Sequence, residues 1–169
     1  MIRQVYKVMA KESMKIREAT ENDVSLILFF IKEIAKYEKM EADVVATEEL
    51  LRYWLFEQQK AEVIIGEVDG KPVGFALYFY NFSTFLGRAG LYLEDLYLLP
   101  DYRGKGFGKQ FFKKLAQTAV QKGCGRMEWC CLDWNVNSIA FYQSMGAIPM
   151  EEWTTYRLTG DTLTELAKE

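Results

Sequence analysis

The stretch LYLEDLYLLPDYRGKGFGKQFFKKL, residues 91–115, decides the fold that this 169-residue chain is expected to adopt. It reads as an apolar strand, a Pro-Asp turn, a basic loop with three glycines and an amphipathic helix. Backbone N–H groups at the start of a helix lack partners within the helix and lie at the positive end of its dipole. Glycines beside them let a ligand approach the backbone closely. The stretch therefore predicts a phosphate-binding loop that directly follows a strand.

Upstream of this stretch, hydrophobic periodicity predicts a strand followed by two helices. The strand covers residues 15–19, and the T-x-x-D sequence at residues 20–23 is a capping box that begins a helix ending near Tyr37. A second helix is expected from Thr47 to Glu57. Its inward-facing side chains are expected to be Leu50, Leu51, Trp54 and Leu55.

A hairpin is expected next, between the second helix and the glycine loop. Residues 61–68 and 73–80 read as its strands, because Asp69-Gly70 between them has the composition of a tight turn. Residues 81–88 are expected to form a loop that exposes Phe82 and Phe85.

Downstream of the loop, helices and strands are expected to alternate. The expected elements are a helix from Gly106 or Phe107 to Gln121, a strand over 127–132, a helix over 137–145 that Asn135 caps and Gly146 ends, a strand over 153–158 and a helix capped by Asp161. The inward side chains of the first of these helices are expected to be Phe111, Phe112, Leu115 and Ala119. The whole order predicts an α/β fold with a mixed sheet and helices on both faces.

The composition excludes several classes of site. The chain contains no histidine, which removes Ser-His-Asp and Cys-His catalysis and the HExxH zinc site. Cys124, Cys130 and Cys131 are expected to be reduced and buried, and they lack the CxxC spacing of a metal site. No apolar run is long enough to span a bilayer, and the N-terminus lacks the apolar stretch of a signal peptide. We therefore expect a cytoplasmic protein without a metal.

Charge is distributed unevenly along the chain. Residues 103–126 carry seven basic residues and no acid, whereas residues 21–49 carry eight acids against three lysines. The first region favours an anion and the second a cation, although two solvated helix faces would give the same pattern. So short a basic run in an acidic protein does not indicate nucleic-acid binding. Residues 1–13 show no period and are read as an N-terminal extension, and residues 14–169 as a single domain.

The glycine loop matches neither of two common nucleotide-binding patterns. A Walker A loop requires GxxxxGK[ST], but Arg103 stands at its first glycine and Gln110 at its Ser/Thr. A Rossmann fingerprint requires Gly or Ala where Lys109 stands. What remains is [RQ]-x-x-G-x-[GA], formed by Arg103, Gly106 and Gly108 between a strand and a helix. Such a loop is suited to a pyrophosphate.

In these motifs the chain resembles the GNAT superfamily of acyl-CoA N-acyltransferases, from about Met14 to its end. The shared motifs are A-T-x-x-D at 19–23, V-G-F-A at 73–76, the glycine loop, W-N-x-x-S-x-x-F-Y at 134–142 and G-A at 146–147. Three further blocks resemble the diamine acetyltransferases, the spermidine/spermine and thialysine N-acetyltransferase group. They are I-K-E-I-A-K-Y-E at 31–38, Y-L-E-D-L at 92–96 and D-Y-R-G-K-G-F-G at 101–108.

The resemblance implies a mostly antiparallel central sheet, acetyl-CoA as cosubstrate, and a homodimer. Main-chain groups of the strand before the loop would hold the acetyl carbonyl and the pantetheine arm. The cofactor-binding residues that the resemblance implies are Leu96, Tyr97, Leu98, Arg103, Gly104, Lys105, Gly106, Phe107, Gly108, Lys109, Asn135, Ser138 and Tyr142. Asn135 has the simpler alternative of a helix cap alone. Tyr37 and Glu38 would contact the amine substrate.

The chemistry of amine acetylation suggests which residues transfer protons. An alkyl ammonium with a pKa of about 10.4 costs about 4–5 kcal/mol to deprotonate at pH 7, so a base is required beside it. Glu94 is the first candidate because it shares a strand face with Leu96, and Asp95 on the opposite face is the second. The resemblance places Tyr142 as the acid that protonates the departing thiolate. A paired or surface role for Glu94 and a core role for Tyr142 are the alternatives.

The expected activity is acetyl transfer to a primary amine of a small diamine, polyamine or thialysine-like amino acid. Direct attack in a ternary complex is expected, because no histidine is present to activate a cysteine. The substrate-binding residues would be Tyr37, Glu38, Glu94 and Asp95. The diamine group carries an acid where this chain has Thr154, which favours a smaller amine or an amino acid over spermine. The alternatives are acetylation of protein or peptide amines and a non-catalytic acyl-CoA-binding regulatory module.

Overall fold

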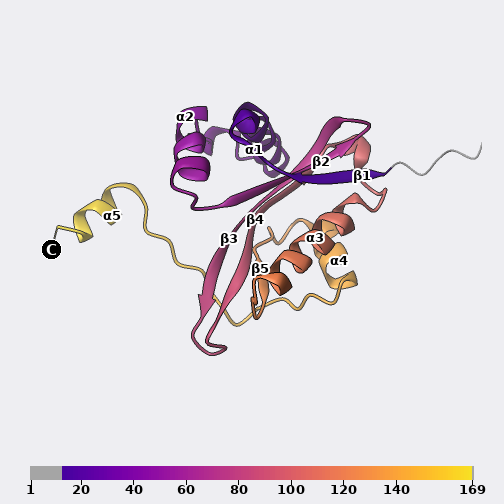
Figure 1. Cartoon of the computed structure of the whole chain (residues 1–169). Coiled ribbons are helices and arrows are strands. Elements are labelled where there is room, and N and C mark those ends of the chain that lie inside the picture. The colour runs from indigo at the N-terminus through magenta and orange to yellow at the C-terminus, as the bar shows by residue number, and fades with distance from the viewer. Residues whose placement is uncertain (1–12, 169) are drawn as a thin grey trace, which may run out of the picture. The chain divides into compact units, whose positions relative to one another are not determined.

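The computed structural model describes residues 13–168 (Figure 1), so the expected N-terminal extension lies, except for its last residue, outside the described residues. The chain divides into two compact units, residues 1–130 and residues 131–169. The first unit carries the sheet and the glycine loop, and the second carries two further helices. Among residues 13–168, no helix is both long enough and apolar enough to cross a membrane.

Five strands form one sheet in the described part of the first unit, in the order β1-β2-β3-β4-β5. They are β1 (Met14–Glu18), β2 (Glu62–Val68), β3 (Lys71–Ser83), β4 (Arg88–Leu98) and β5 (Met127–Trp129). Neighbours from β1 to β4 are antiparallel, and β5 runs parallel to β4. The predicted mixed, mostly antiparallel sheet is therefore confirmed, although the strand expected over 127–132 ends at Trp129, where its pairing with β4 ends.

Helices cover both faces of this sheet, as the sequence predicts (Figure 1). On one face, Ile27 and Phe30 of α1 (Val24–Glu38) pack with Val63, Phe75 and Tyr97 of the sheet. The rings of Phe30 and Phe75 stack with centroids 5.3 Å apart. Burial of such aromatic side chains is the largest favourable contribution to a core of this size.

The other face is covered by α3 (Phe107–Gln121), whose bounds and inward residues match the prediction. It lies so close to β2 that a Cβ atom on Gly66 would come within 2.8 Å of the Phe111 ring. Since side chains alternate along a strand, Gly66 and Val63 face opposite sides. The glycine is therefore required by the close approach of the helix.

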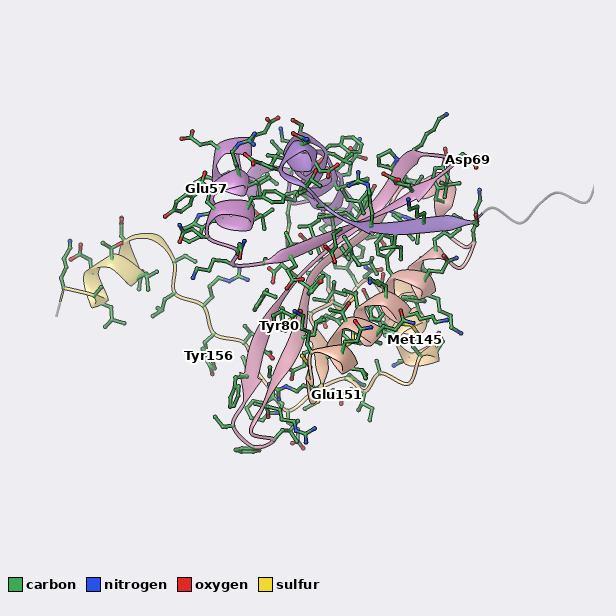
Figure 2. All side chains as sticks on the ribbon, viewed as in Figure 1. Glu57, Asp69, Tyr80, Met145, Glu151 and Tyr156 are labelled. Atoms are coloured by element: carbon green, nitrogen blue, oxygen red, sulfur yellow. The ribbon has the colours of Figure 1, made fainter. Side chains whose placement is uncertain are left out.

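Two hairpins connect β2, β3 and β4. The first turns at Asp69 (labelled in Figure 2) and Gly70, whose φ values of 50° and 74° are both left-handed, as a tight hairpin turn requires. This turn was predicted correctly. The loop predicted over 81–88 is too long, because the strand pairing continues until Ser83 opposite Arg88. Phe82 and Phe85 are exposed as expected.

The two helical predictions before the sheet have different outcomes. The Thr20 N–H donates to the Asp23 carboxylate at 2.7 Å, which confirms the capping box before α1. Thr47 caps α2 (Glu48–Leu51) as predicted, but the helix continues as a π-helix over Arg52–Glu57. The wider i→i+5 turn breaks the 3.6-residue period on which the prediction depends. Leu51 and Leu55 face the core, whereas Leu50 and Trp54 are 47% and 46% exposed, so these two predictions are wrong.

The second unit contains α4 (Val136–Ser144) and α5 (Gly160–Leu166). Asn135 Oδ1 accepts from the Ser138 N–H at 3.3 Å, and Gly146 after the helix has a φ of 87°, as predicted. The strand predicted over 153–158 is wrong, because these residues adopt no strand pairing within the described part of this unit. Thr159 rather than Asp161 precedes α5 as its cap residue.

The three cysteines are free thiols, as expected, but none of them is fully buried, since Cys124 and Cys131 are partly exposed. Cys130 is exposed, and its Sγ lies 3.1 Å from the Tyr92 hydroxyl. The expectation of a buried Cys130 is wrong because the strand ends one residue before it, so no further strand pairing covers this position.

Arg17 of β1 forms ion pairs with a residue of β2 and with the residue that precedes α1, and these ion pairs are expected to stabilise the fold. Its guanidinium binds Glu67 at 2.7 Å and Asp23 at 2.8 Å, and this hydrogen bond to Arg17 lowers the pKa of Asp23 to about 2. We expect Arg17→Met to reduce the free energy of unfolding by about 1–2 kcal/mol at pH 7. The Asp23 contribution is present above its unfolded pKa near 4 and is lost as the pH falls toward 2.

Urea unfolding at pH 7 and at pH 2.5 measures this difference. Arg52→Met is the matched control, because its ion pair with Glu21 is exposed on both sides and is expected to contribute little. An Arg17→Met loss that is equal at both pH values, or equal to the loss in the control, would contradict the assignment.

Candidate functional site

A β-bulge in β4 organises the site. The register pairs Leu77 with Asp95 and Tyr78 with Leu93, so Glu94 is the extra residue of the strand. Leu77 packs with the α1 core cluster, and its neighbour Tyr78 faces the opposite side. Asp95 therefore faces α1, while Leu93, only two residues earlier, faces α3. A regular strand would place both on one face.

Three carboxylates gather at this bulge on the α1 side. Burial raises the pKa of Asp95 to about 6, and the negative charges of Glu94 and Glu38 add to that increase. Burial also raises the pKa of Glu38, which is the last residue of α1. Glu94 is exposed in the bulge. Asp95, the second candidate from the sequence, is thus a partly buried carboxyl group with two other acids near it.

Such a cluster is suited to a cationic ligand. Like charges held close together and partly out of water destabilise one another, and a bound ammonium relieves that repulsion. A carboxyl group with a pKa near 6 is also close to the range in which a general base works best. The cluster can therefore bind an amine and accept a proton from it.

The glycine loop lies at the C-terminal end of the same strand. Gly104 and Gly106 have φ values of 72° and 84°, which a residue with a side chain rarely adopts, and the space where their Cβ atoms would lie is open. Gly106 is the cap residue of α3, and no side chain caps that helix end. The first N–H groups of a 15-residue helix are thus presented to an anion, which fits the pyrophosphate of a CoA molecule.

The other residues predicted for cofactor binding occupy differing surroundings. Tyr97 and Phe107 are 5% and 1% exposed, so their side chains are not available to a ligand. Leu98 uses its carbonyl oxygen to accept from Arg103 Nε at 2.9 Å. Lys105, Gly108, Lys109 and Leu96 belong to the loop, the first turn of α3 and β4, as expected.

Arg103 lies in the loop as expected, and its side chain makes contacts that the sequence does not predict. Its guanidinium carbon lies 4.8 Å from the ring centroid of Tyr37 and 5.1 Å from that of Tyr97. The loop is thereby connected to α1 through a side chain. Nothing in the motif [RQ]-x-x-G-x-[GA] signals this contact, because Tyr37 lies 66 positions upstream.

The remaining predicted residues lie in the second unit. Tyr142, Ser138 and the cap residue Asn135 all belong to α4 or its N-terminal boundary. Residues 135 and 138 are joined by the capping hydrogen bond. Asn135 thus has the capping role that was its simpler alternative, and a cofactor role for it remains a prediction. Among the described residues, no group of three or more acidic or cysteine side chains is arranged to hold a metal ion.

Comparison with known proteins identifies the class to which this fold and site belong. Residues 28–147 match the model of the acetyltransferase (GNAT) family. A thialysine N-epsilon-acetyltransferase from Sus scrofa is 39% identical over 167 residues, which cover 92% of this chain and 98% of the relative. The chain therefore belongs to the GNAT family and is an N-acetyltransferase, which sets aside the non-catalytic alternative.

Two further similarities support this assignment. An L-ornithine N5-acetyltransferase from Arabidopsis thaliana is 34% identical over 200 residues, covering 91% of this chain and 88% of the relative. The structure of an integron cassette protein from V. cholerae superimposes with a TM-score of 0.76 at 31% identity, covering 93% of this chain and 99% of that one. The family and the fold thus agree across nearly the whole chain.

The raised pKa of Asp95 predicts a stabilising substitution. Between pH 4 and pH 6 the unfolded carboxyl ionises while the folded one remains protonated, so the stability of the protein falls over this range and stays lower above it. Asp95→Asn removes this penalty. We expect it to raise the free energy of unfolding at pH 8 by on the order of 1–3 kcal/mol, and by much less at pH 4.

Denaturant unfolding of the variant and the parent at both pH values measures the effect. Asp43→Asn, at an exposed aspartate, is the control and should leave stability nearly unchanged at either pH. A variant that is no more stable than the parent at pH 8 would show that Asp95 does not carry the buried charge assigned to it.

Proposed function

We propose that this enzyme transfers the acetyl group of acetyl-CoA to a primary amine of a small diamine or of a thialysine-like amino acid. The observation that carries the proposal is the cluster of Glu38, Glu94 and Asp95 on one side of a strand that leads into an anion-binding loop. The acids select a cationic substrate, and the loop holds the pyrophosphate of the cosubstrate. The reacting groups then meet along β4.

The carboxylates supply both binding and proton transfer. The charged amine is attracted to the cluster as an ammonium and must lose a proton before it attacks the acetyl carbonyl. We assign that proton to Glu94, directly or through one water molecule, with Asp95 as the second acceptor. The proton released by the amine thus stays in a site that already holds three negative charges.

The cofactor end uses the backbone of the loop and of β4. N–H groups after Gly106 would bind the pyrophosphate, and Lys105 and Lys109 would add positive charge. Main-chain groups of Leu96, Tyr97 and Leu98 would hold the acetyl carbonyl and the pantetheine arm. These assignments require only backbone groups at the buried positions, which is consistent with the burial of Tyr97 and Phe107.

Acetyl transfer completes in one ternary complex. The neutral amine nitrogen forms a bond to the acetyl carbon and then loses its second proton to solvent, and the carbon–sulfur bond breaks. The departing thiolate takes a proton from an acid that solvent reprotonates. A neutral tyrosine suits that last step, since its hydroxyl can hydrogen-bond the sulfur and protonate it, and we assign it to Tyr142. A cysteine-linked intermediate is not required, because no histidine is present to activate one.

The class of amine is proposed from the relatives and the charge of the site. Relatives named for thialysine and for ornithine act on amino acids that carry a side-chain amine. Three acids suit a substrate that carries a second positive charge besides the reacting amine. We also propose that residues 14–169 form one catalytic domain and that the enzyme works as a homodimer in the cytoplasm.

Release of CoA thiol from acetyl-CoA in the presence of an amine panel tests the proposal. The panel contains thialysine, lysine, ornithine, putrescine, spermidine, spermine and a lysine-rich peptide. We expect thialysine or a short diamine to give the highest kcat/KM, exceeding that of the peptide by about a hundredfold or more, equivalent to about 3 kcal/mol. A peptide that is the best substrate would overturn the assignment to small amines.

Two variants test the acid–base roles in the same assay. Glu94→Gln and Tyr142→Phe are each expected to lower kcat at least about tenfold between pH 6 and pH 9, because each removes a proton-transfer group. Asp43→Asn, an exposed acid on a separate segment, is the control for loss of charge alone. If neither Glu94→Gln nor Tyr142→Phe lowers kcat to that extent, the assignment of base and acid is wrong.

A further inference from the structure

The first residue of the glycine loop contacts the amine side of the site. Arg103 lies over the Tyr37 ring at 4.8 Å and over the Tyr97 ring at 5.1 Å. Its Nε donates to the Leu98 carbonyl oxygen at 2.9 Å. A single side chain of the loop therefore contacts the last turn of α1 and the end of β4 together.

The neighbours of these two rings are the acids of the amine site. Tyr37 directly precedes Glu38, and Tyr97 lies two residues after Asp95, on the same face of β4. The two rings that Arg103 contacts therefore belong to the same short segments as Glu38 and Asp95.

The guanidinium is well suited to this role. It is planar and permanently charged, so it can lie against aromatic faces while one of its N–H groups holds a carbonyl oxygen. A lysine at this position would keep the charge but lose the planar contact. Gly104 and Gly106 have left-handed φ values and shape the loop from which the arginine side chain projects. A ligand that restrains this loop therefore also restrains the backbone of Arg103.

From this geometry we propose that Arg103 is a positioning residue that couples the cofactor loop to the amine site, and not a ligand of the CoA pyrophosphate. The inference rests on the proposed function for the identity of the two ligands. An anion on the loop restrains Arg103, which restrains Tyr37 and Tyr97 and thereby orders Glu38 and Asp95. Because coupling between two ligands is reciprocal, a bound amine also tightens the binding of CoA by the same factor.

Arg103→Lys and Arg103→Gln test the coupling, with Lys105→Gln as the contrasting variant in the same loop. The Nζ atom of Lys105 lies 5.2 Å from the centroid of the Tyr102 ring. We expect both Arg103 variants to raise KM for the amine about threefold to tenfold, from the loss of the planar guanidinium contact with two rings, and to change the CoA dissociation constant in calorimetry less than about twofold. Lys105→Gln is expected to weaken CoA binding and to leave the amine KM unchanged.

A second measurement is independent of catalysis. The N–H of Met40 donates to the Ala35 carbonyl oxygen at 2.8 Å and that of Lys39 to Lys36 at 3.2 Å, so both amides report on the end of α1. CoA added to the parent protein is expected to slow their hydrogen exchange several-fold, and this effect is expected to disappear in Arg103→Gln.

Three results would overturn the proposal. Arg103 variants that weaken CoA binding tenfold or more while the amine KM stays constant would make Arg103 a pyrophosphate ligand. Variants in which both constants stay unchanged would remove any role, and exchange at Lys39 and Met40 that does not respond to CoA in the parent would remove the coupling. Failure of the proposed function would look different from failure of the coupling. The parent protein would then release no CoA thiol with any amine, but CoA binding and its effect on hydrogen exchange could still be measured.

Discussion

The register of β3 and β4 is the constraint on which the site depends. A single extra residue, Glu94, lies between the pair Leu77–Asp95 and the pair Tyr78–Leu93. Before the bulge, Leu93 faces α3; after it, Asp95 and Tyr97 face α1. One slip in pairing thus changes which face the odd-numbered side chains of β4 occupy: Leu93 belongs to the hydrophobic layer under α3, whereas Asp95 lies on the side of α1, whose last residue is Glu38.

The same bulge puts the Asp95 carboxyl group in surroundings where its negative charge lowers the stability of the fold. A carboxyl group that is partly buried beside two other acids is destabilised in its ionised form, and the raised pKa of Asp95 reflects that cost. The aromatic packing of Phe30, Phe75 and Tyr97 offsets the cost and holds the strand in place. Carboxyl groups that lower stability in this way are common at catalytic positions, which agrees with the amine-binding role that we propose for Asp95.

Most of the fold could be predicted because local signals agree with the final structure. The capping box at Thr20, the Asp69-Gly70 turn and the glycines before α3 each act within a few residues. The bulge, the π-helix after α2 and the contact of Arg103 with Tyr37 depend on segments far apart in the chain or on a local departure from regular geometry. Predictions from periodicity assume regular spacing. They therefore put Asp95 on the strand face opposite Glu94, and they put Trp54 among the side chains that face the core.

A crystal structure with a bisubstrate conjugate tests the role of the acids at the bulge most directly. The ligand is CoA joined through an acetyl spacer to the side-chain nitrogen of thialysine. We predict that this nitrogen lies within about 3 Å of the Glu94 or Asp95 carboxylate, or of one water molecule bound to it, with the pyrophosphate on the N–H groups after Gly106. A conjugate whose amine portion contacts neither carboxylate would contradict it.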